Sequence, residues 1–176
     1  MLATMNRIAI EPQVLGQYML RIFQADPDPD RLVSLRQKLG LSTVEAGRWY
    51  PQTLLLRYLQ IILKTDGEDI LFETGMKLIA STLFPSNVTT FHEAISSMDL
   101  GYAIAHRNQV GSMFGLRASG TMQLDIIAAN PYPCPFDWGI LQGIMKRFSP
   151  AARLSHDFSQ GCRLDSETAC HYHLIF

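Results

Sequence analysis

The sequence predicts an α+β domain in which a helical N-terminal layer packs on a small antiparallel sheet. Apolar residues recur every three or four positions in the N-terminal half, which is typical of helices, whereas beyond Gly101 they alternate with polar residues, which is typical of strands. With 176 residues, 47% of them hydrophobic and 18% charged, the chain is long enough to bury a substantial core. We therefore expect a single domain over residues 1–176.

The charge balance and the cysteine count limit the classes of function. A net charge of −1 argues against a nucleic-acid-binding protein held mainly by phosphate contacts. No apolar run reaches the roughly 18 residues of a membrane span, and residues 1–7 lack the pattern of a signal peptide. Three cysteines are most simply read as reduced thiols, so we expect a cytoplasmic protein.

The first helices are delimited by prolines and glycines. A helix follows Pro12 and ends at the Asp26-Pro-Asp-Pro segment, because proline cannot donate the next backbone hydrogen bond. A second helix is closed by Gly40. Ser42 and Glu45 match a capping box, which predicts a further short helix.

Three more helices complete the predicted layer. Residues 52–64 are apolar on most sides, which predicts a helix central to the core. Residues 68–83 form the next helix, with Gly75 in its interior at a cost of about 1 kcal/mol relative to alanine. We expect close approach of another backbone to compensate that cost. Thr90 and Glu93 form a second capping box and start the last helix.

The C-terminal half changes period and predicts strands around one helix. Residues 112–118 and 121–129 read as two strands joined by a hairpin turn at Ser119-Gly120. The three prolines that follow exclude a helix or a central strand over residues 130–135. Residues 153–158 and 169–176 read as two further strands, so the predicted order is strand–strand–helix–strand–strand.

The helix between these strand pairs is predicted to run from Asp137, as its N-cap, to Phe148. Gly139 and Gly143 lie four residues apart on one face. Because glycine has no side chain, this face can approach another backbone closely.

Three local segments resemble a known family. The segments are Asn130-Pro-Tyr-Pro-Cys-Pro-Phe-Asp-Trp-Gly, the pair Cys162 and Cys170 with the following His-Tyr-His-Leu-Ile, and Tyr102-Ala-Ile-Ala-His-Arg. Together with the order of elements, they resemble the ligand-binding superfamily of vinyl-reductase-type (4-vinyl reductase) domains, haem-nitric-oxide-binding domains and the small subunits of the TRAPP tethering complex. The local segments are most similar to vinyl-reductase-type domains.

The resemblance implies binding of small molecules or lipids, dimerisation and a regulatory role, usually without catalysis. The sequence also lacks a Gly-x-Ser-x-Gly elbow, a phosphate loop, a His-Glu-x-x-His motif and a dinucleotide fingerprint. We therefore expect a non-enzymatic regulatory or sensory module, dimeric in the manner of the family, that binds an apolar small molecule or a partner protein. The alternatives are a haem-based gas sensor and a scaffold or assembly subunit of the TRAPP type; an accessory role in tetrapyrrole metabolism stays open.

A metal site is implied because vinyl-reductase-type domains carry a cysteine and histidine site. Cys134, Cys162 and Cys170 match it by position, with His171 or His173 as the fourth ligand, and these donors suit zinc. Strand alternation turns both histidines away from the face that carries Cys170, so a shared metal would require a bulge. Buried free thiols are the alternative interpretation.

Haem is the second cofactor that the resemblance raises, because the haem-nitric-oxide-binding branch uses one proximal histidine. His92 and His106 both precede the first predicted strand, which is the corresponding region. The Tyr-x-Ser-x-Arg motif that holds the haem propionates in that branch is absent. A solvent-facing His92 and a hydrogen-bonded His106 are the alternative interpretations.

Aromatic and methionine side chains could line an apolar pocket between helices and sheet, although ordinary core packing is the alternative for each of them. The candidates are Trp49, Tyr58, Phe91, Met98, Tyr102, Phe114, Trp138 and Met145.

Overall fold

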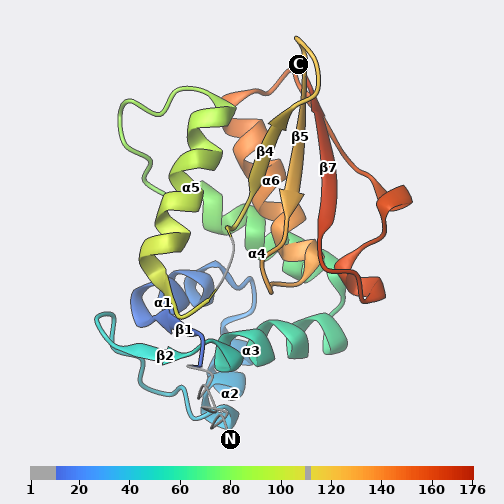
Figure 1. Ribbon diagram of the computed structural model, residues 1–176. Helices are drawn as coiled ribbons and strands as arrows, with labels where there is room; N and C mark the ends of the chain where they lie inside the picture. The colour runs from blue at the N-terminus through green and yellow to red at the C-terminus, as the bar shows by residue number, and fades with distance from the viewer. Residues whose placement is uncertain (1–10, 110–111) are drawn as a thin grey trace, which may run out of the picture.

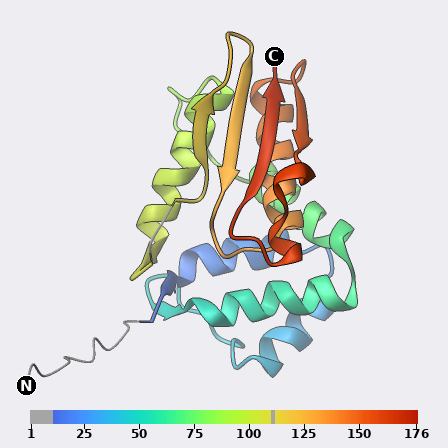
Figure 2. The ribbon, with the colours of Figure 1, turned by 45° about the vertical axis from the view of Figure 1, so that its right-hand side comes forward.

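The chain folds as predicted into a mixed structure of helices and antiparallel sheet (Figure 1). The computed structural model describes residues 11–109 and 112–176. In Figure 2 the larger sheet stands on a layer of N-terminal helices. The expectation about a signal peptide in residues 1–7 lies outside the described residues.

The N-terminal half is helical, as its apolar spacing predicts. Asp28 caps the second helix by accepting hydrogen bonds from the amides of Asp30 and Arg31, and the predicted capping box of Thr90 and Glu93 is present in the fifth. The bounds are α1 (Gly16–Ala25), α2 (Pro29–Lys38), α3 (Gln52–Thr65), α4 (Glu68–Ala80) and α5 (Phe91–Ala105).

The short helix predicted at Ser42 and Glu45 is wrong. The segment between α2 and the next strand is irregular, because the Arg36 side chain holds its carbonyl groups. Arg36 Nε donates to the Leu41 carbonyl at 3.1 Å, and Arg36 Nη2 donates to the Ser42 carbonyl at 3.1 Å. A guanidinium thus takes the place of helical amide donors.

A small sheet that the sequence does not predict joins three distant segments. Its strands are β1 (Gln13–Leu15), β2 (Trp49–Pro51) and β3 (His106–Arg107), in the order β2-β1-β3 with antiparallel pairs. Val14 lies opposite His106, so this sheet fixes the end of α5 to the segment that leads into α1.

The larger sheet has the predicted strand–strand–helix–strand–strand order. Its strands pair antiparallel in the order β4-β5-β7-β6. The bounds are β4 (Gly115–Ala118), β5 (Gln123–Ala128), α6 (Cys134–Phe148), β6 (Arg153–His156) and β7 (Cys170–Ile175), with the short turns η1 (Phe158–Gln160) and η2 (Arg163–Asp165) before β7.

Helices α4 and α6 pack with their backbones in close contact, as the glycines predict. A Cβ on Gly75 would overlap the carbonyl oxygen of Phe136, and a Cβ on Gly139 would overlap that of Phe72. A Cβ on Gly143 would press on the Ile79 side chain. This contact places the start of α6 firmly against the helical layer.

The predicted N-cap of α6 is wrong. The N-cap is Pro133, four residues earlier, so Cys134 and Pro135 are helical although the prolines were expected to exclude a helix there; Pro135 lies in the first turn, where the missing amide hydrogen costs nothing. Asp137 is fully buried and pairs with Arg163 instead of capping the helix.

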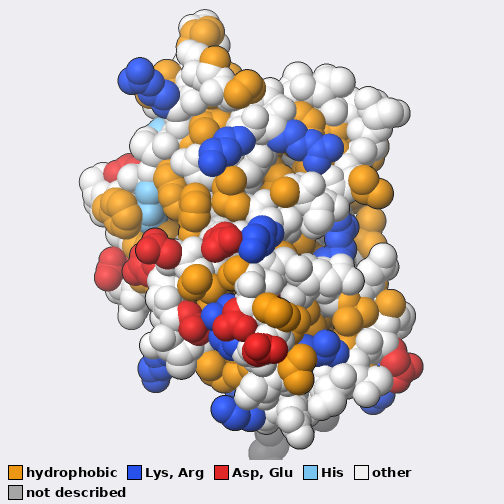
Figure 3. All heavy atoms as spheres, turned by 180° about the vertical axis from the view of Figure 1, so that it is seen from behind, with side chains coloured by type: hydrophobic (Ala, Val, Ile, Leu, Met, Phe, Trp, Pro, Cys, Tyr) orange, Lys and Arg blue, Asp and Glu red, His pale blue; other side chains and the backbone are white. Residues whose placement is uncertain are grey.

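The surface seen from the side opposite to Figure 1 carries basic and acidic side chains interspersed with apolar ones (Figure 3). Within the described residues, none of the helices combines the length and the apolar character that crossing a membrane requires.

Candidate functional site

Four donor side chains converge at the start of α6. They are Cys134, His156 at the end of β6, Cys162 before η2 and Cys170 at the start of β7, and their donor atoms all lie within 4.8 Å of one another. The Sγ atoms of Cys162 and Cys170 are 3.5 Å apart, and Cys134 Sγ lies 3.8 Å from His156 Nδ1. We call this group the cysteine–histidine cluster.

The strand register explains which histidine joins the cysteines. His156 lies opposite Tyr172 in the β6–β7 pair, so it faces the same side of the sheet as Tyr172 and Cys170. His173 faces the other side, with Nδ1 2.8 Å from Asp125 Oδ1 and Nε2 3.2 Å from Asp157 Oδ2. The cluster therefore holds the three predicted cysteines and His156, but neither His173 nor its neighbour His171.

The geometry of the cluster fits a zinc ion. Tetrahedral Zn–S bonds of about 2.3 Å place neighbouring sulfurs about 3.8 Å apart, close to the separations found here. All three cysteines are free and buried. Four protein donors complete the coordination of a structural zinc site and leave no position for a substrate.

Backbone and guanidinium donors surround the sulfur atoms. The Arg163 amide and Arg163 Nε each donate to Cys170 Sγ at 3.4 Å, and the Leu164 amide donates to Cys162 Sγ at 3.5 Å. A hydrogen bond from the Cys134 thiol and the donors of Arg163 lower the pKa of the Cys170 thiol. The hydrogen bond to Cys170 and burial raise the pKa of the Cys134 thiol. Such outer contacts orient metal ligands and favour the thiolate form.

Arg163 also anchors the loop that leads into α6. Its Nη1 donates to Asn130 Oδ1 at 3.0 Å and to the Tyr132 carbonyl at 2.8 Å, and its Nη2 pairs with Asp137. Burial raises the pKa of Asp137 to about 6, against the opposing effect of the Arg163 charge. The same guanidinium therefore balances negative charge in the cluster and holds the proline-rich loop.

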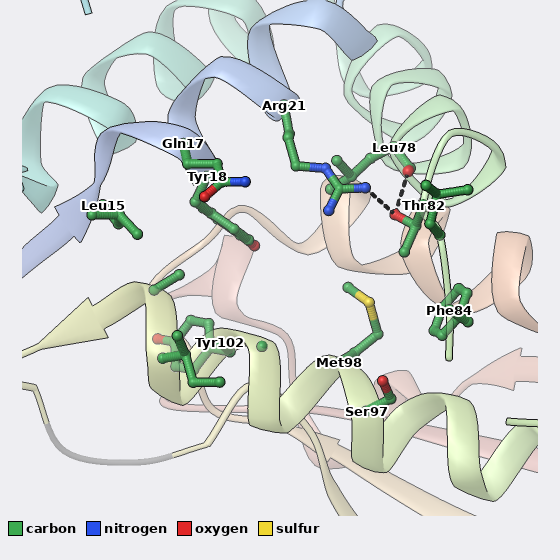
Figure 4. A pocket seen from close by; sticks show the side chains of 14 residues that line it. Leu15, Gln17, Tyr18, Arg21, Leu78, Thr82, Phe84, Ser97, Met98 and Tyr102 are labelled. Carbon is green, nitrogen blue, oxygen red and sulfur yellow. Dashed lines mark hydrogen bonds between the residues drawn. The ribbon is translucent and has the colours of Figure 1, made fainter. Parts of the chain in front are cut away.

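A cavity of about 320 Å³ lies between α1 and α5 and forms a second candidate site, the α1/α5 cavity (Figure 4). Met98 and Tyr102 from the predicted pocket set line it, and Trp138 lines a separate hollow beside Cys134 and His156. The other five predicted pocket residues do not line the α1/α5 cavity; they are Trp49, Tyr58, Phe91, Phe114 and Met145.

The walls of this cavity are mainly apolar, but two polar groups lack strong partners. The buried hydroxyl of Tyr18 has no hydrogen-bond partner among residues 11–109 and 112–176, and burial raises its pKa. Arg21 Nη2 reaches only two neutral oxygens, Thr82 Oγ1 at 3.3 Å and the Ser81 carbonyl at 3.5 Å. Among the described residues no carboxylate lies within 4.0 Å of the Arg21 guanidinium.

His106 lies beside the cavity in a packed aromatic cluster. Its Nδ1 is 2.8 Å from the Tyr102 carbonyl, and its Nε2 is 2.5 Å from the Tyr132 hydroxyl. The Tyr102 ring stacks on the imidazole, and the Tyr18 ring meets it edge-on. Burial lowers the pKa of His106 to about 4, so the ring is neutral. His92 is exposed in the first turn of α5.

Comparison with known proteins identifies the fold. No protein-family model and no curated protein matches the chain. Among solved structures, an H-NOX protein from S. oneidensis in the Fe(II)NO state matches with a TM-score of 0.66 and 13% identity, over 91% of this chain and 97% of that one. A mutant H-NOX of T. tengcongensis matches with a TM-score of 0.67 and 13% identity, over 92% and 96% of the two chains. The chain has the H-NOX fold.

The likeness covers nearly the whole length of both chains in each pair. The H-NOX domain of Shewanella oneidensis in the Fe(II)CO state, solved by NMR, gives a TM-score of 0.65 and 13% identity over 93% and 98% of the two chains. Identity this low shows a shared H-NOX fold alone. The closer resemblance to vinyl-reductase-type domains and to TRAPP subunits stays a prediction.

The side chains of this chain do not fit a haem group as they stand. Both ring nitrogens of His106 have partners within the protein, so neither is free for iron, and Tyr18 and Tyr102 cover the ring. His92 does not line the α1/α5 cavity. A haem bound through His106 would require the Tyr132 side chain to leave.

Several site residues escape sequence reasoning. His156 is recognisable only from its register with Tyr172, because 22 positions separate it from Cys134. Arg163 has no motif of its own. Tyr18 and Arg21 do carry a signal, since residues three apart share one face of a helix.

Proposed function

We propose that this chain is a non-enzymatic sensory domain that binds an apolar small molecule in the α1/α5 cavity. The observation that carries the proposal is the cavity itself, with its mainly apolar walls and its unpartnered Tyr18 hydroxyl. Ligand sites in proteins are mostly apolar hollows that contain a few placed polar groups. The volume of about 320 Å³ suits a small ligand.

In this proposal the cysteine–histidine cluster holds a structural zinc. The cluster ties the start of α6 to the end of β6, the turn before η2 and the start of β7. A closed site of four protein ligands stabilises a fold without offering a position for chemistry. Zinc would therefore brace the sheet half of the domain while the ligand binds between α1 and α5.

Titration with the neutral fluorescent dye Nile red tests the proposed ligand site. Gly101 lines the cavity, and a Cβ there would meet nothing within 4 Å, so the backbone leaves room to start a larger side chain, and Gly101→Phe is designed to narrow the cavity. We expect the wild type to bind the dye and Gly101→Phe to lose at least tenfold in affinity.

The matched control is Ala103→Phe, which adds the same ring to an exposed position of α5 outside the cavity lining. It should bind Nile red like the wild type. Equal binding by wild type and Gly101→Phe, or no binding by the wild type, would contradict the proposed site.

A haem-based gas sensor is the second candidate function, and the comparisons favour it. The neighbours named above are H-NOX proteins, two of them in Fe(II)NO and Fe(II)CO states. Haem reconstitution followed by absorption spectroscopy tests this candidate. A Soret band that disappears in His106→Ala would establish it, whereas the absence of a specific band in the wild type would exclude it.

We also propose that the domain forms a homodimer through the surface of α5 around Leu100, beside the α1/α5 cavity that Leu83 and Ile104 help to line. Leu100 and Ile104 of this helix and the nearby Leu83 are large apolar side chains exposed to solvent. Light scattering on Leu100→Glu, which changes an exposed residue outside the cavity lining, tests this: the wild type should have the mass of a dimer and the variant that of a monomer. A monomeric wild type would contradict it. The cytoplasmic location stays a prediction.

A further inference from the structure

We infer that the α1/α5 cavity selects a carboxylic acid with an apolar tail, and that Arg21 and Tyr18 bind the carboxylate. This inference rests on the proposed small-molecule function and adds the chemical class of the ligand. It is carried by two polar groups on one face of α1 that lack the partners their chemistry requires.

Arg21 supplies a positive charge that has no negative partner in the described part of the chain. Its side chain descends from α1 toward Thr82 (Figure 4), where its two acceptors are neutral and at least 3.3 Å away. A guanidinium has five N–H donors in a planar fork that matches the two oxygens of a carboxylate. Most of that donor capacity is unused here.

No acidic side chain competes for this charge within the cavity. Among the residues that line it, Arg21 is the one charged side chain. A second guanidinium, that of Arg147, donates to the Thr82 carbonyl at 2.8 Å and lies over the Phe84 ring, outside the lining. A site with one cation and no anion suits a ligand with a single negative charge.

Tyr18 supplies a buried donor from the same face of α1. It precedes Arg21 by three positions, so both side chains leave the same face of α1. Both point into the space between α1 and α5 in Figure 4. A tyrosine hydroxyl is protonated at neutral pH and can donate, so a carboxylate oxygen that reached it would end the cost of burying it without a partner.

The rest of the cavity suits the tail of such an acid. Leu78, Met98 and Tyr102 form apolar walls beyond the two polar groups. A volume of about 320 Å³ is at the lower end of the roughly 300–1,000 Å³ typical of ligand pockets. The size favours a medium-length aliphatic acid or an acid with a single ring.

Calorimetric titration with octanoate and with 1-octanol tests the inference, because the two probes share a tail and differ in the charged group. We expect octanoate to bind the wild type at least tenfold more tightly than 1-octanol, since hydrogen bonds to charged groups are the stronger ones. Arg21→Gln should weaken octanoate at least tenfold and leave 1-octanol unchanged.

Two further variants separate charge from folding. Arg21→Lys keeps the charge without the planar fork and should retain an intermediate affinity for octanoate. Tyr18→Phe should weaken octanoate about threefold. Thermal unfolding of each variant checks that the fold is intact.

The outcomes distinguish the inference from the function on which it rests. Equal binding of octanoate and 1-octanol to both the wild type and Arg21→Gln would overturn the carboxylate inference and leave small-molecule binding in place. Binding of neither octanoate nor 1-octanol, together with no binding of Nile red, would overturn both.

Discussion

The cysteine–histidine cluster and the α1/α5 cavity differ in how completely their polar groups are partnered. In the cluster, four donors converge within 4.8 Å, and backbone amides and Arg163 reach the sulfur atoms from outside. In the cavity of about 320 Å³, the residues that the structure describes give the Tyr18 hydroxyl no hydrogen-bond partner and give Arg21 two weak ones.

This difference indicates a different task for each region. A closed set of ligands with a complete outer shell is pre-organised for one ion and adds to stability. Buried polar groups without partners cost free energy in the free protein, and a ligand that supplies those partners recovers it. The cluster is therefore suited to stabilise the fold with a bound metal ion, and the cavity is suited to bind and release a small ligand.

The largest expected effect comes from breaking the cluster. Cys162→Ser removes one of four ligands, so we expect loss of zinc and a fall of at least about 3 kcal/mol in the free energy of unfolding, or roughly 10 °C in Tm for a domain of this size. Elemental analysis and thermal unfolding measure the two effects. A chelator should destabilise the wild type similarly.

The control for this change is His173→Asn, which alters a histidine on the opposite face of β7. It should retain zinc in full. A wild type that contains no metal and is indifferent to the chelator would contradict the proposed role of the cluster.

Acid should destabilise the protein through His106, which lies between the two regions. Its pKa is lowered to about 4 in the folded state from 6.5, so the unfolded chain takes up a proton first as pH falls. The stabilisation is complete above pH 6.5 and is lost as pH falls through 4, by about 3 kcal/mol in the free energy of unfolding.

Denaturant unfolding of wild type and His106→Gln between pH 7 and 4 measures this contribution. The difference in stability between the two proteins should shrink as pH falls, because the glutamine does not titrate. A difference that stays constant over this range would show that His106 does not control the acid response.

Two glycine-to-alanine substitutions compare the packed α4–α6 contact with the uncrowded surface of α5 at Gly101. Gly139→Ala pushes a methyl group into the backbone of α4, so we expect a loss of about 2–3 kcal/mol in unfolding free energy. Gly101→Ala meets no atom within 4 Å and should gain about 1 kcal/mol from helix propensity. Equal effects of the two changes in chemical denaturation would contradict the close α4–α6 packing.

Two tyrosine substitutions should give the smallest changes in the free energy of unfolding. They test directly whether each tyrosine hydroxyl has a hydrogen-bond partner. Tyr18→Phe removes an unpartnered hydroxyl and should stabilise the ligand-free protein by about 1 kcal/mol. Tyr132→Phe leaves His106 Nε2 without a partner and should destabilise it by about 1–2 kcal/mol. Thermal unfolding measures both changes, and a loss of stability in Tyr18→Phe would mean that its hydroxyl has a partner.

The elements that the sequence predicts correctly are those with a local signal. The Thr90 and Glu93 capping box and the glycines on the packed face of α6 are of this kind, whereas the prolines misplaced the start of α6, which already includes Cys134 and Pro135. The small β1–β3 sheet lacks such a signal, because strands of two or three residues have no period and form only when distant segments pair.

The residues of the candidate sites likewise divide into those with a local sequence signal and those placed by long-range contacts. Cys134, Cys162 and Cys170 are conspicuous because the chain has no other cysteines, but His156 joins them only through the register of β6 with β7. Asp137 resembles an N-cap by type and position, yet tertiary pairing with Arg163 decides its place. Long-range contacts of this kind leave no local pattern.

The central claim is that two separate occupants bind, one in each region, and native mass spectrometry in the presence of octanoate tests it most directly. The wild type should carry one zinc and one octanoate per chain. Gly101→Phe should carry zinc without octanoate, and chelated wild type should lose zinc. A wild type with neither occupant, or a Gly101→Phe variant that binds octanoate like the wild type, would contradict the account.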